Sequence, residues 1–281
     1  MKALQFNAFY CTLTILGLST ILIGCGSSPT STVNSPNSSV SSPSSPAPTE
    51  TSPNSPTISP SSPSPEATLS EIQQQPVWVK PPQTQEVSGE EGMDLQVGET
   101  LRTEGDALAQ VDLSNGLAFR IGGDATLTLQ PSNQLDLESG EMITWVEPGQ
   151  TVPAEIVTPG GIAGIRGTTV YVKIPDDLNG EILFFAWEGE VAVRLPEQTE
   201  EILLQSGQEV RVPPGETDIA KIRAAVRQLP PDEWKARRTD SRLLNKFDEA
   251  LPTLSEIEAV EEGMKMLNST PSPHSNHPRT K

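Results

Sequence analysis

Between residues 89 and 213, short apolar runs alternate with glycine, asparagine, aspartate or proline. Short apolar runs bounded by turn residues are typical of β-strands. The run 182–187 is apolar on both faces and is expected at the centre of a sheet. Asn115-Gly116 favours a hairpin turn. The predicted strands span residues 108–113, 117–121, 125–129, 170–174, 182–187, 191–195, 202–205 and 209–212.

After residue 213 the apolar positions recur at helical spacing, which predicts a helical segment over residues 214–267. A second helix is expected to open at Asp232-Glu233, because acidic side chains favour the first turn. A third is expected to have Ser255 as its N-cap and Glu258 as its capping-box partner. The apolar positions are Ile219, Ile222, Val226 and Leu229 in the first helix, Trp234, Leu243, Leu244 and Phe247 in the second, and Ile257, Val260, Met264 and Leu267 in the third.

The N-terminus has the pattern of an export signal. Lys2 precedes an apolar stretch over residues 8–23, which is short for a membrane-spanning helix. The stretch ends in Leu22, Ile23, Gly24 and Cys25, which resembles a bacterial lipobox. We therefore expect residues 1–24 to be removed and Cys25 to carry lipid. The alternative is an ordinary membrane anchor that contains a cysteine.

Residues 26–66 are almost entirely serine, proline, threonine and asparagine. Such a segment cannot bury enough apolar surface to offset the entropy of ordering, so residues 25–88 are predicted to form a disordered, lipidated stalk. The stalk either holds the folded part away from the membrane or is a filler linker. A second polar stretch, residues 268–281, is expected to be a disordered tail.

Charge and composition exclude several classes of function. The formal net charge of −18 argues against nucleic acid as a ligand, because phosphate contacts need clustered lysine and arginine. The two cysteines, Cys11 and Cys25, exclude a disulfide framework and a cysteine zinc site. The two histidines, His274 and His277, lie in the tail. We predict no catalytic residue, no metal and no cofactor, although a paired-carboxylate hydrolase stays open by sequence.

The segment 157–170 reads V-T-P-G-G-I-A-G-I-R-G-T-T-V and contains one cation, Arg166. Its glycines and its proline predict a bent, closely packed strand pair. We expect Arg166 to be structural, with its guanidinium bonded to carbonyl groups or to an acid, and Glu188 is the predicted partner. The alternative is that Arg166 belongs to a ligand or partner surface.

An ordered set of short motifs resembles a FecR-type domain over residues 98–212. The set begins with Gly98-x-x-Leu101-x-Thr103, Leu113-x-x-Gly116, Arg120-Ile121-Gly122 and Leu137-x-x-Gly140. It continues with Thr158-Pro159, Arg166-Gly167-Thr168 and Gly189 in the run Trp187-Glu188-Gly189-Glu190-Val191. The resemblance implies an all-β, twisted, solenoid-like stack of short strands, in which these motif residues are structural.

The regulators for which this family is known carry a cytoplasmic N-terminal segment and a membrane-spanning helix. Here a lipid anchor and a stalk take that place, so the resemblance does not imply the family's iron-signalling role. We expect a non-catalytic binding or scaffolding lipoprotein on the periplasmic side of the inner or outer membrane. Its partner would be an envelope protein or a cell-wall polymer. The alternative is an envelope sensor that contacts a membrane regulator.

Basic side chains are concentrated in the predicted helices. These helices either cover the acidic β domain or present a contact surface for an anionic envelope polymer or a partner protein. The candidate residues for such a surface are Lys235, Arg237, Arg238 and Arg242.

Overall fold

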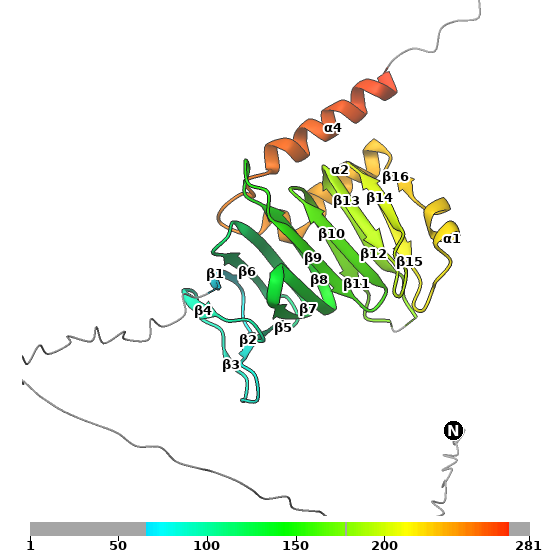
Figure 1. The fold of residues 1–281 in the computed structure, drawn as a ribbon. Coiled ribbons are helices and arrows are strands. Elements are labelled where there is room, and N and C mark those ends of the chain that lie inside the picture. Colours follow the sequence, from blue (N-terminus) through cyan, green and yellow to red (C-terminus); the bar gives the residue numbers. More distant parts are fainter. Residues whose placement is uncertain (1–65, 178, 270–281) are drawn as a thin grey trace, which may run out of the picture. The chain divides into compact units, whose positions relative to one another are not determined.

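The computed structural model describes residues 66–177 and 179–269. Cys25 and the lipobox, most of the predicted stalk and nearly all of the predicted tail lie outside these residues. The described strands join into one hydrogen-bonded sheet, and helices follow at the C-terminal side (Figure 1). The predicted mainly β fold with a C-terminal helical segment is therefore confirmed.

The centre of the sheet is a long hairpin of β7 (Leu117–Gln130) and β8 (Gln134–Val146), joined by the short 3-10 helix η1 (Pro131–Asn133). Its register shifts between Gly122 and Thr126, where both strands bend. Gly140 lies at this bend with φ of +80°. A Cβ on Gly140 would come within 2.4 Å of the Ala125 Cα, so only glycine fits.

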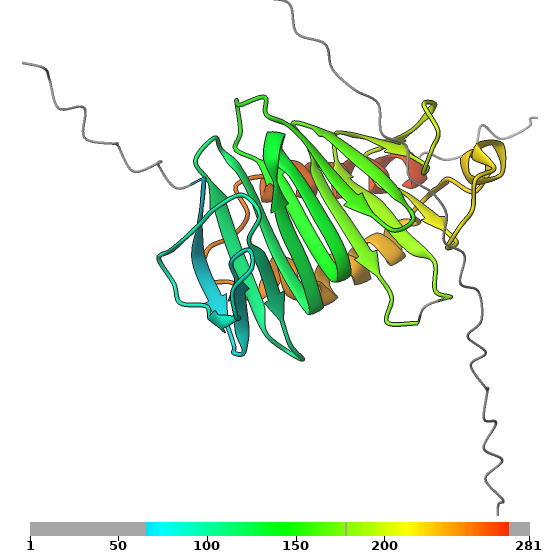
Figure 2. The same ribbon diagram turned by 60° about the horizontal axis from the view of Figure 1, so that its bottom comes forward.

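The bend divides the sheet into two layers, because each half of the hairpin pairs with different strands (Figures 1 and 2). The first layer contains β4 (Met93–Leu95), β1 (Ala67–Gln73), β6 (Leu108–Leu113), the first half of β7, the second half of β8, β11 (Thr169–Ile174), β12 (Ile182–Glu188), β15 (Gln208–Val212) and β16 (Arg227–Gln228). The second layer contains β3 (Val87–Ser88), β2 (Val77–Lys80), β5 (Thr100–Thr103), the other halves of β7 and β8, β9 (Pro153–Thr158), β10 (Gly161–Arg166), β13 (Glu190–Arg194) and β14 (Glu201–Gln205).

Strand pairing in both layers is antiparallel except between β8 and β9, which run parallel. Most neighbours are joined as hairpins or by crossings between layers, so the finer prediction of a solenoid-like stack is not confirmed. The expected central position of the run 182–187 is confirmed, since β12 lies between β11 and β15 and is buried on both faces.

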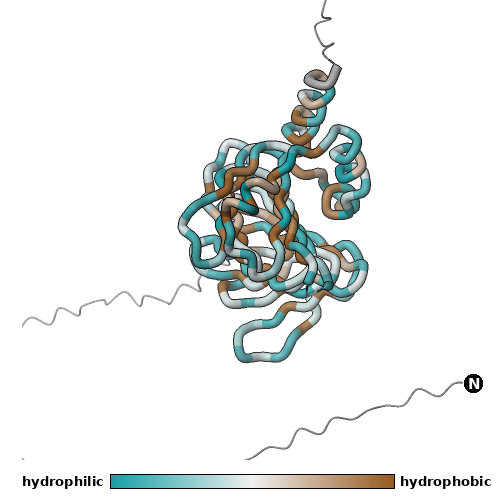
Figure 3. The backbone as a smooth tube through the Cα atoms, turned by 90° about the vertical axis from the view of Figure 1, so that its right-hand side faces the viewer, coloured by the Kyte–Doolittle hydropathy of each residue, from teal (hydrophilic) through white to brown (hydrophobic). Residues whose placement is uncertain are grey.

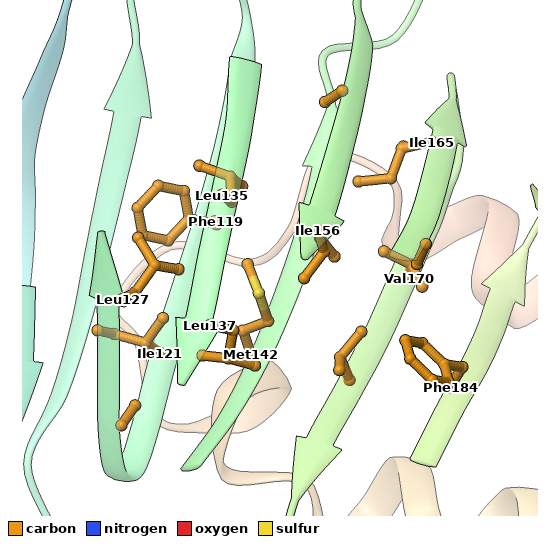
Figure 4. Packing of buried hydrophobic residues seen from close by; sticks show 14 of the residues in the cluster. Phe119, Ile121, Leu127, Leu135, Leu137, Met142, Ile156, Ile165, Val170 and Phe184 are labelled. Carbon is orange, nitrogen blue, oxygen red and sulfur yellow. The ribbon is translucent and has the colours of Figure 1, made fainter. Parts of the chain in front are cut away.

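The main hydrophobic core lies between the two layers. Phe119, Val170 and Phe184 enter it from the first layer, and Leu127 and Ile156 enter it from the second (Figure 4). Each of these side chains is fully buried. Hydrophobic and hydrophilic residues are interspersed along the folded chain (Figure 3). In the second layer, buried and more exposed positions alternate along β9, β10 and β14, so one face of this layer turns toward the core.

The outer face of the first layer is also apolar, and the C-terminal helices cover it. Trp145 and Trp187 from the sheet pack with Trp234, Leu243 and Ile257 from the helical segment. The layer is therefore buried on both sides, whereas none of the described helices lies on the outer face of the second layer (Figure 2). The helices are α1 (Ile219–Ala224), α2 (Pro231–Asp240), α3 (Arg242–Asn245) and α4 (Leu254–Ser269).

The folded domain begins earlier than residue 89, which corrects the predicted end of the stalk. Residues 67–88, assigned to the stalk by sequence, contribute β1, β2 and β3 to the sheet. Val77 and Val79 are buried, and β2 pairs with β5. The mixed polar composition of this stretch concealed strands whose partners are far away in the chain.

The helix boundaries also differ from the prediction. The first helix ends at Ala224, because Arg227 and Gln228 pair with β15 instead of continuing the turn. The second helix is divided at Ser241, whose hydroxyl accepts a hydrogen bond from the Leu244 N–H. Ser255 lies inside α4 rather than at its N-cap, and its hydroxyl donates to Glu256. Tertiary pairing and local side-chain bonds decided these boundaries.

Candidate functional site

The segment Arg166-Gly167-Thr168 carries the chain from β10 in the second layer to β11 in the first. Gly167 has φ of +77°, a conformation that favours glycine. A second crossing, from β12 to β13, occurs at Gly189, where φ is +76°. The two crossings pack directly on each other. A Cβ on Gly189 would lie 2.4 Å from the Cγ2 of the buried Thr168.

The neighbouring threonine ties this crossing to the helical segment. The Thr169 hydroxyl lies 2.7 Å from the Thr253 hydroxyl, just before α4, and donates to Glu188 at 3.0 Å. Burial raises the pKa of Glu188. Thr169, at the start of β11, therefore links the end of β12 to the residue just before α4.

Thr158 and Pro159 form the tight turn between β9 and β10. The buried Thr158 hydroxyl donates to the Gly161 carbonyl at 2.8 Å and accepts from the Gly160 N–H. Pro159 is exposed in the turn. These two residues organise the backbone of the hairpin that leads to Arg166.

Arg166 does not have the surroundings that the sequence suggested. Its side chain is exposed, and no ion pair or hydrogen bond of it occurs within the described residues. Glu188, the predicted partner, instead accepts from Thr169. The expectation of a bonded, structural Arg166 is therefore wrong, because its position at the end of β10 turns the side chain outward at the crossing.

The buried arginine of the domain is Arg120, in the Arg120-Ile121-Gly122 motif. It is 1% exposed, and burial lowers its pKa to about 10. The guanidinium donates to Gln110 at 2.7 Å and to the carbonyls of Leu243 and Glu249 at 3.0 and 2.6 Å. This role could not be predicted from local sequence, because the carbonyl acceptors lie more than a hundred residues away.

The outer face of the second layer has a shallow hollow of about 340 Å³ next to Arg166. The register places Leu203 opposite Ala192, and Ala192 opposite Gly164. Because two of these three side chains are small, the surface is depressed between Ile162 and Arg166. Leu203 is 49% exposed at the margin of this face.

The glycine at position 164 is not required by the backbone. Its φ lies outside the left-handed region, and a Cβ would meet the Ala192 carbonyl oxygen and Cβ at 3.6 and 3.7 Å, which is ordinary contact. The sequence signal for this face was the run Ile202-Leu203-Leu204, since three successive apolar residues in a strand place at least one on the outer face.

Three of the four basic candidates in the helices have carboxylate partners within the chain. The ion pairs bring α2 and α3 onto the sheet and onto α4, as expected if the helices cover the acidic β domain. Lys235 is exposed. The pairs are Arg237 with Glu209 at 2.6 Å, Arg238 with Glu261 at 2.8 Å and with Glu258 at 3.3 Å, and Arg242 with Asp106 at 3.2 Å.

Within residues 66–177 and 179–269, no three histidine, cysteine, aspartate or glutamate side chains are grouped so that they could hold a metal ion. In the same part of the chain, no helix has both the length and the apolar character needed to span a membrane.

Comparison with known proteins identifies the central region of the chain. Residues 99–192 match the model of the family described as FecR protein. This stretch contains β5 to β12 and most of β13, including the crossings at Arg166–Thr168 and at Gly189. The protein is therefore a mainly β protein that carries a FecR domain. A search of curated proteins found no match.

Two crystal structures of a candidate anti-sigma factor from Parabacteroides distasonis, at 1.65 and 2.50 Å resolution, are similar to part of the chain. Their sequence identities are 19% and 18%, with TM-scores of 0.33 and 0.36. The alignments cover 40% and 42% of this chain. They span about half of the structures they match, 53% and 56%.

Proposed function

We propose that the protein is a lipid-anchored envelope module that binds another envelope component through the outer face of its second layer, without catalysing a reaction. The observation that most directly supports this proposal is the position of Arg166. It is an exposed arginine without a carboxylate partner in the described residues, and it lies beside the hollow at Gly164 and Ala192. The partner is an envelope protein or a cell-wall polymer.

The distribution of covered surfaces supports this face. The first layer is closed on its outer side by the chain's own helices, through Trp234, Leu243 and Ile257. Among the described residues, no helix covers the outer face of the second layer, which has an exposed leucine, Leu203, and an arginine without an ion pair, Arg166. Exposed apolar and arginine side chains around a depression are typical of interaction surfaces.

A sensing role is the second candidate, and the FecR match over residues 99–192 favours it. In that case the same face would contact a membrane regulator, and the protein would relay a signal by this contact. The two candidates differ in the partner and share the surface, so one experiment addresses both.

The test is photo-crosslinking of the full chain in cells. A photoreactive residue replaces Leu203 or Ile162 on the proposed face, and replaces Lys235 on α2 in a matched control. We expect a covalent adduct from the first two positions, and Arg166→Glu should reduce its yield by about fivefold or more.

The adduct separates the candidates. An adduct with a wall polymer resists protease, whereas a protein adduct is digested, and mass spectrometry of its peptides distinguishes a membrane regulator from another envelope protein. Crosslinking from Lys235 but not from Leu203 or Ile162 would instead assign binding to the basic helices. If Arg166→Glu leaves the yield of adduct unchanged, Arg166 does not contribute to binding.

A further inference from the structure

The sheet has one long open edge. Within the described residues, the first layer ends at β4 and β16 and the second at β3 and β14, each of which pairs on one side only. The strands β4, β16 and β3 have three, two and two residues, whereas β14 has five. It lies at the end of the second layer that is nearer α1 (Figure 1). Because short edge strands limit pairing with another chain, β14 is the edge best able to accept one.

The main-chain groups of Leu203 face this open side. The Gln205 N–H donates to the Gln208 side chain at 2.9 Å, so Gln205 turns away from β13. The Glu201 carbonyl also turns away, since it accepts from the Arg223 guanidinium at 3.4 Å. Alternate residues of an antiparallel strand point their main-chain groups to the same side, so Leu203 does likewise. On that side no main-chain bond reaches Leu203 within the described residues.

The sequence of β14, Glu-Ile-Leu-Leu-Gln, is complementary to itself in antiparallel pairing. When Leu203 lies opposite Leu203 of a second copy, Glu201 lies opposite Gln205 at both ends. Leu203 is 49% exposed in the single chain, and the pairing covers the two leucines with each other. Cross-strand apolar pairs stabilise a sheet. A register shifted by two residues would instead place the leucine against Glu201 or Gln205.

The two end pairs match in hydrogen bonding and charge. Gln205 Nε2 donates to Glu190 at 2.8 Å, which uses one of the two N–H groups of this amide. The other N–H can donate to the Glu201 carboxylate of a second copy. Arg194, opposite Glu201 on β13, lies 4.0 Å from that carboxylate. Across the four strands each end then carries an acid, an amide, an acid and an arginine, so like charges are never directly opposite.

We propose that two copies of the chain pair through β14 in antiparallel register about Leu203, which joins their second layers into one sheet. Each Leu203 N–H donates to the Leu203 carbonyl of the other copy. The Gln208 and Arg223 side chains give up their main-chain bonds to the arriving strand. Because both copies use the same surface, the contact closes as a two-fold dimer. Ile162 and Arg166 lie outside β14, so the pairing does not depend on the proposed binding function.

The register is tested by disulfide formation between two tagged copies of the full chain. One copy carries Glu201→Cys and the other Gln205→Cys. Directly opposite residues have Cα atoms about 5.5 Å apart, which a disulfide spans. We expect the mixed pair to cross-link at least about fivefold more than either variant alone, because like positions lie about 13 Å apart in this register. The natural chain, with Cys11 and Cys25, gives the background.

The dimer itself is tested by sedimentation of the purified full chain in detergent, with a mass of two chains expected at about 100 μM. Leu203→Pro removes the outward N–H, which the ladder with β13 does not use, so the variant should keep its circular dichroism spectrum. Its dimer should be at least about tenfold weaker, because two main-chain bonds are lost. Leu203→Val keeps the N–H and an apolar side chain, and as the matched control it should dimerise like the natural chain.

A mass of one chain at this concentration overturns the proposal, as do equal cross-linking yields from mixed and single variants. Unchanged dimerisation of folded Leu203→Pro also overturns it, and if this variant does not fold, the cross-linking yields decide. Arg166→Glu should leave the dimer unchanged, which separates the pairing from the proposed binding face. In the photo-crosslinking experiment, an adduct of two copies from Leu203 reports the pairing, whereas an adduct from Ile162 reports the envelope partner.

Discussion

The Arg120 guanidinium donates a hydrogen bond to the main-chain carbonyl of Leu243, with 3.0 Å between Nη1 and the oxygen. This bond joins a central strand of the FecR domain to a helix that lies outside the matched region. The same guanidinium lies 4.1 Å from the Phe247 ring. Arg120 therefore fixes where the C-terminal helices meet the sheet, although the matching family region ends at residue 192.

Arg120→Met is expected to destabilise the fold by about 2 kcal/mol, because the buried carbonyl of Leu243 and the carbonyl of Glu249 lose their donor. Removing a desolvated charge offsets part of this loss. Urea unfolding measures the change in free energy. Arg166→Met is the control, since an exposed and unpaired arginine should change stability by less than about 0.5 kcal/mol. Equal effects of the two variants would contradict the assignment of Arg120.

Glu209 should make stability depend on acid pH. Burial raises the pKa of this carboxyl, but Arg237 and Arg227 outweigh burial and hold the pKa below its ordinary value of 4.5. The folded state therefore favours the ionised form. The stabilisation is present above pH 4.5 and is lost as the pH falls through the lowered pKa.

Glu209→Gln should therefore cost about 2–3 kcal/mol at neutral pH and progressively less in acid, as measured by thermal melting across this range. Glu188→Gln is the comparison. Burial raises the pKa of Glu188, so its protonated form is favoured by folding and its contribution is lost as the pH rises. If the change in stability depended on pH in the same way for both variants, the opposite pKa shifts assigned to Glu209 and Glu188 would be contradicted.

Gly189→Ala should destabilise by about 2 kcal/mol or more, because the new Cβ meets Thr168 and the residue keeps a positive φ. Gly149→Ala separates the two causes. Gly149 has φ of +82° but nothing within 4 Å of a Cβ, so its cost should be about 1 kcal/mol. Gly164→Ala has neither problem and should leave stability unchanged. Chemical denaturation of the three variants tests this order.

Tyr171 should make the free energy of unfolding fall at alkaline pH. Burial raises the pKa of this phenol, and the charge of Glu141 and its hydrogen bond raise it further. Above pH 10.0 the unfolded chain loses this proton while the folded state keeps it, so stability falls as the pH rises. Tyr171→Phe should lose about 1 kcal/mol at neutral pH and recover relative to the natural protein near pH 11. A constant difference would contradict the burial of the phenol.

Cys25→Ser tests the expected lipid anchor. If Cys25 carries the acyl chains, the substitution should move the protein from the membrane fraction to the soluble fraction, because the chains supply most of the membrane affinity. Mass spectrometry of the natural protein should show the lipid on this residue. Unchanged membrane association together with an unmodified cysteine would remove the lipoprotein interpretation.

The strands that were correctly predicted share a local signal. Residues 108–113 show a strand pattern that ends at Asn115-Gly116, and the structure has β6 over the same residues. The FecR motifs were also recognisable, since turn glycines such as Gly189 are fixed by local backbone conformation. By contrast, β1 and β2 were assigned to the stalk because their partners, β6 and β5, are remote.

The candidate sites were less visible in the sequence. Arg166 and Arg120 have similar apolar or glycine neighbours, yet one is exposed and the other is buried under a helix. Arg237 and Glu209, which form an ion pair at 2.6 Å, are also distant in sequence and come from different elements. No local pattern distinguishes a buried arginine from an exposed one, since burial depends on what packs above it.

The amino-acid sequence by itself determined the strand-rich character, the C-terminal helical segment and the FecR resemblance, because periodicity and turn residues act over short distances. Only the tertiary structure decided that two bent strands divide the sheet into two layers and that helices cover one of them. Hydrogen bonds such as Arg120 to Leu243 exist only after distant segments meet. That packing also decides which outer face of the sheet the described helices leave uncovered.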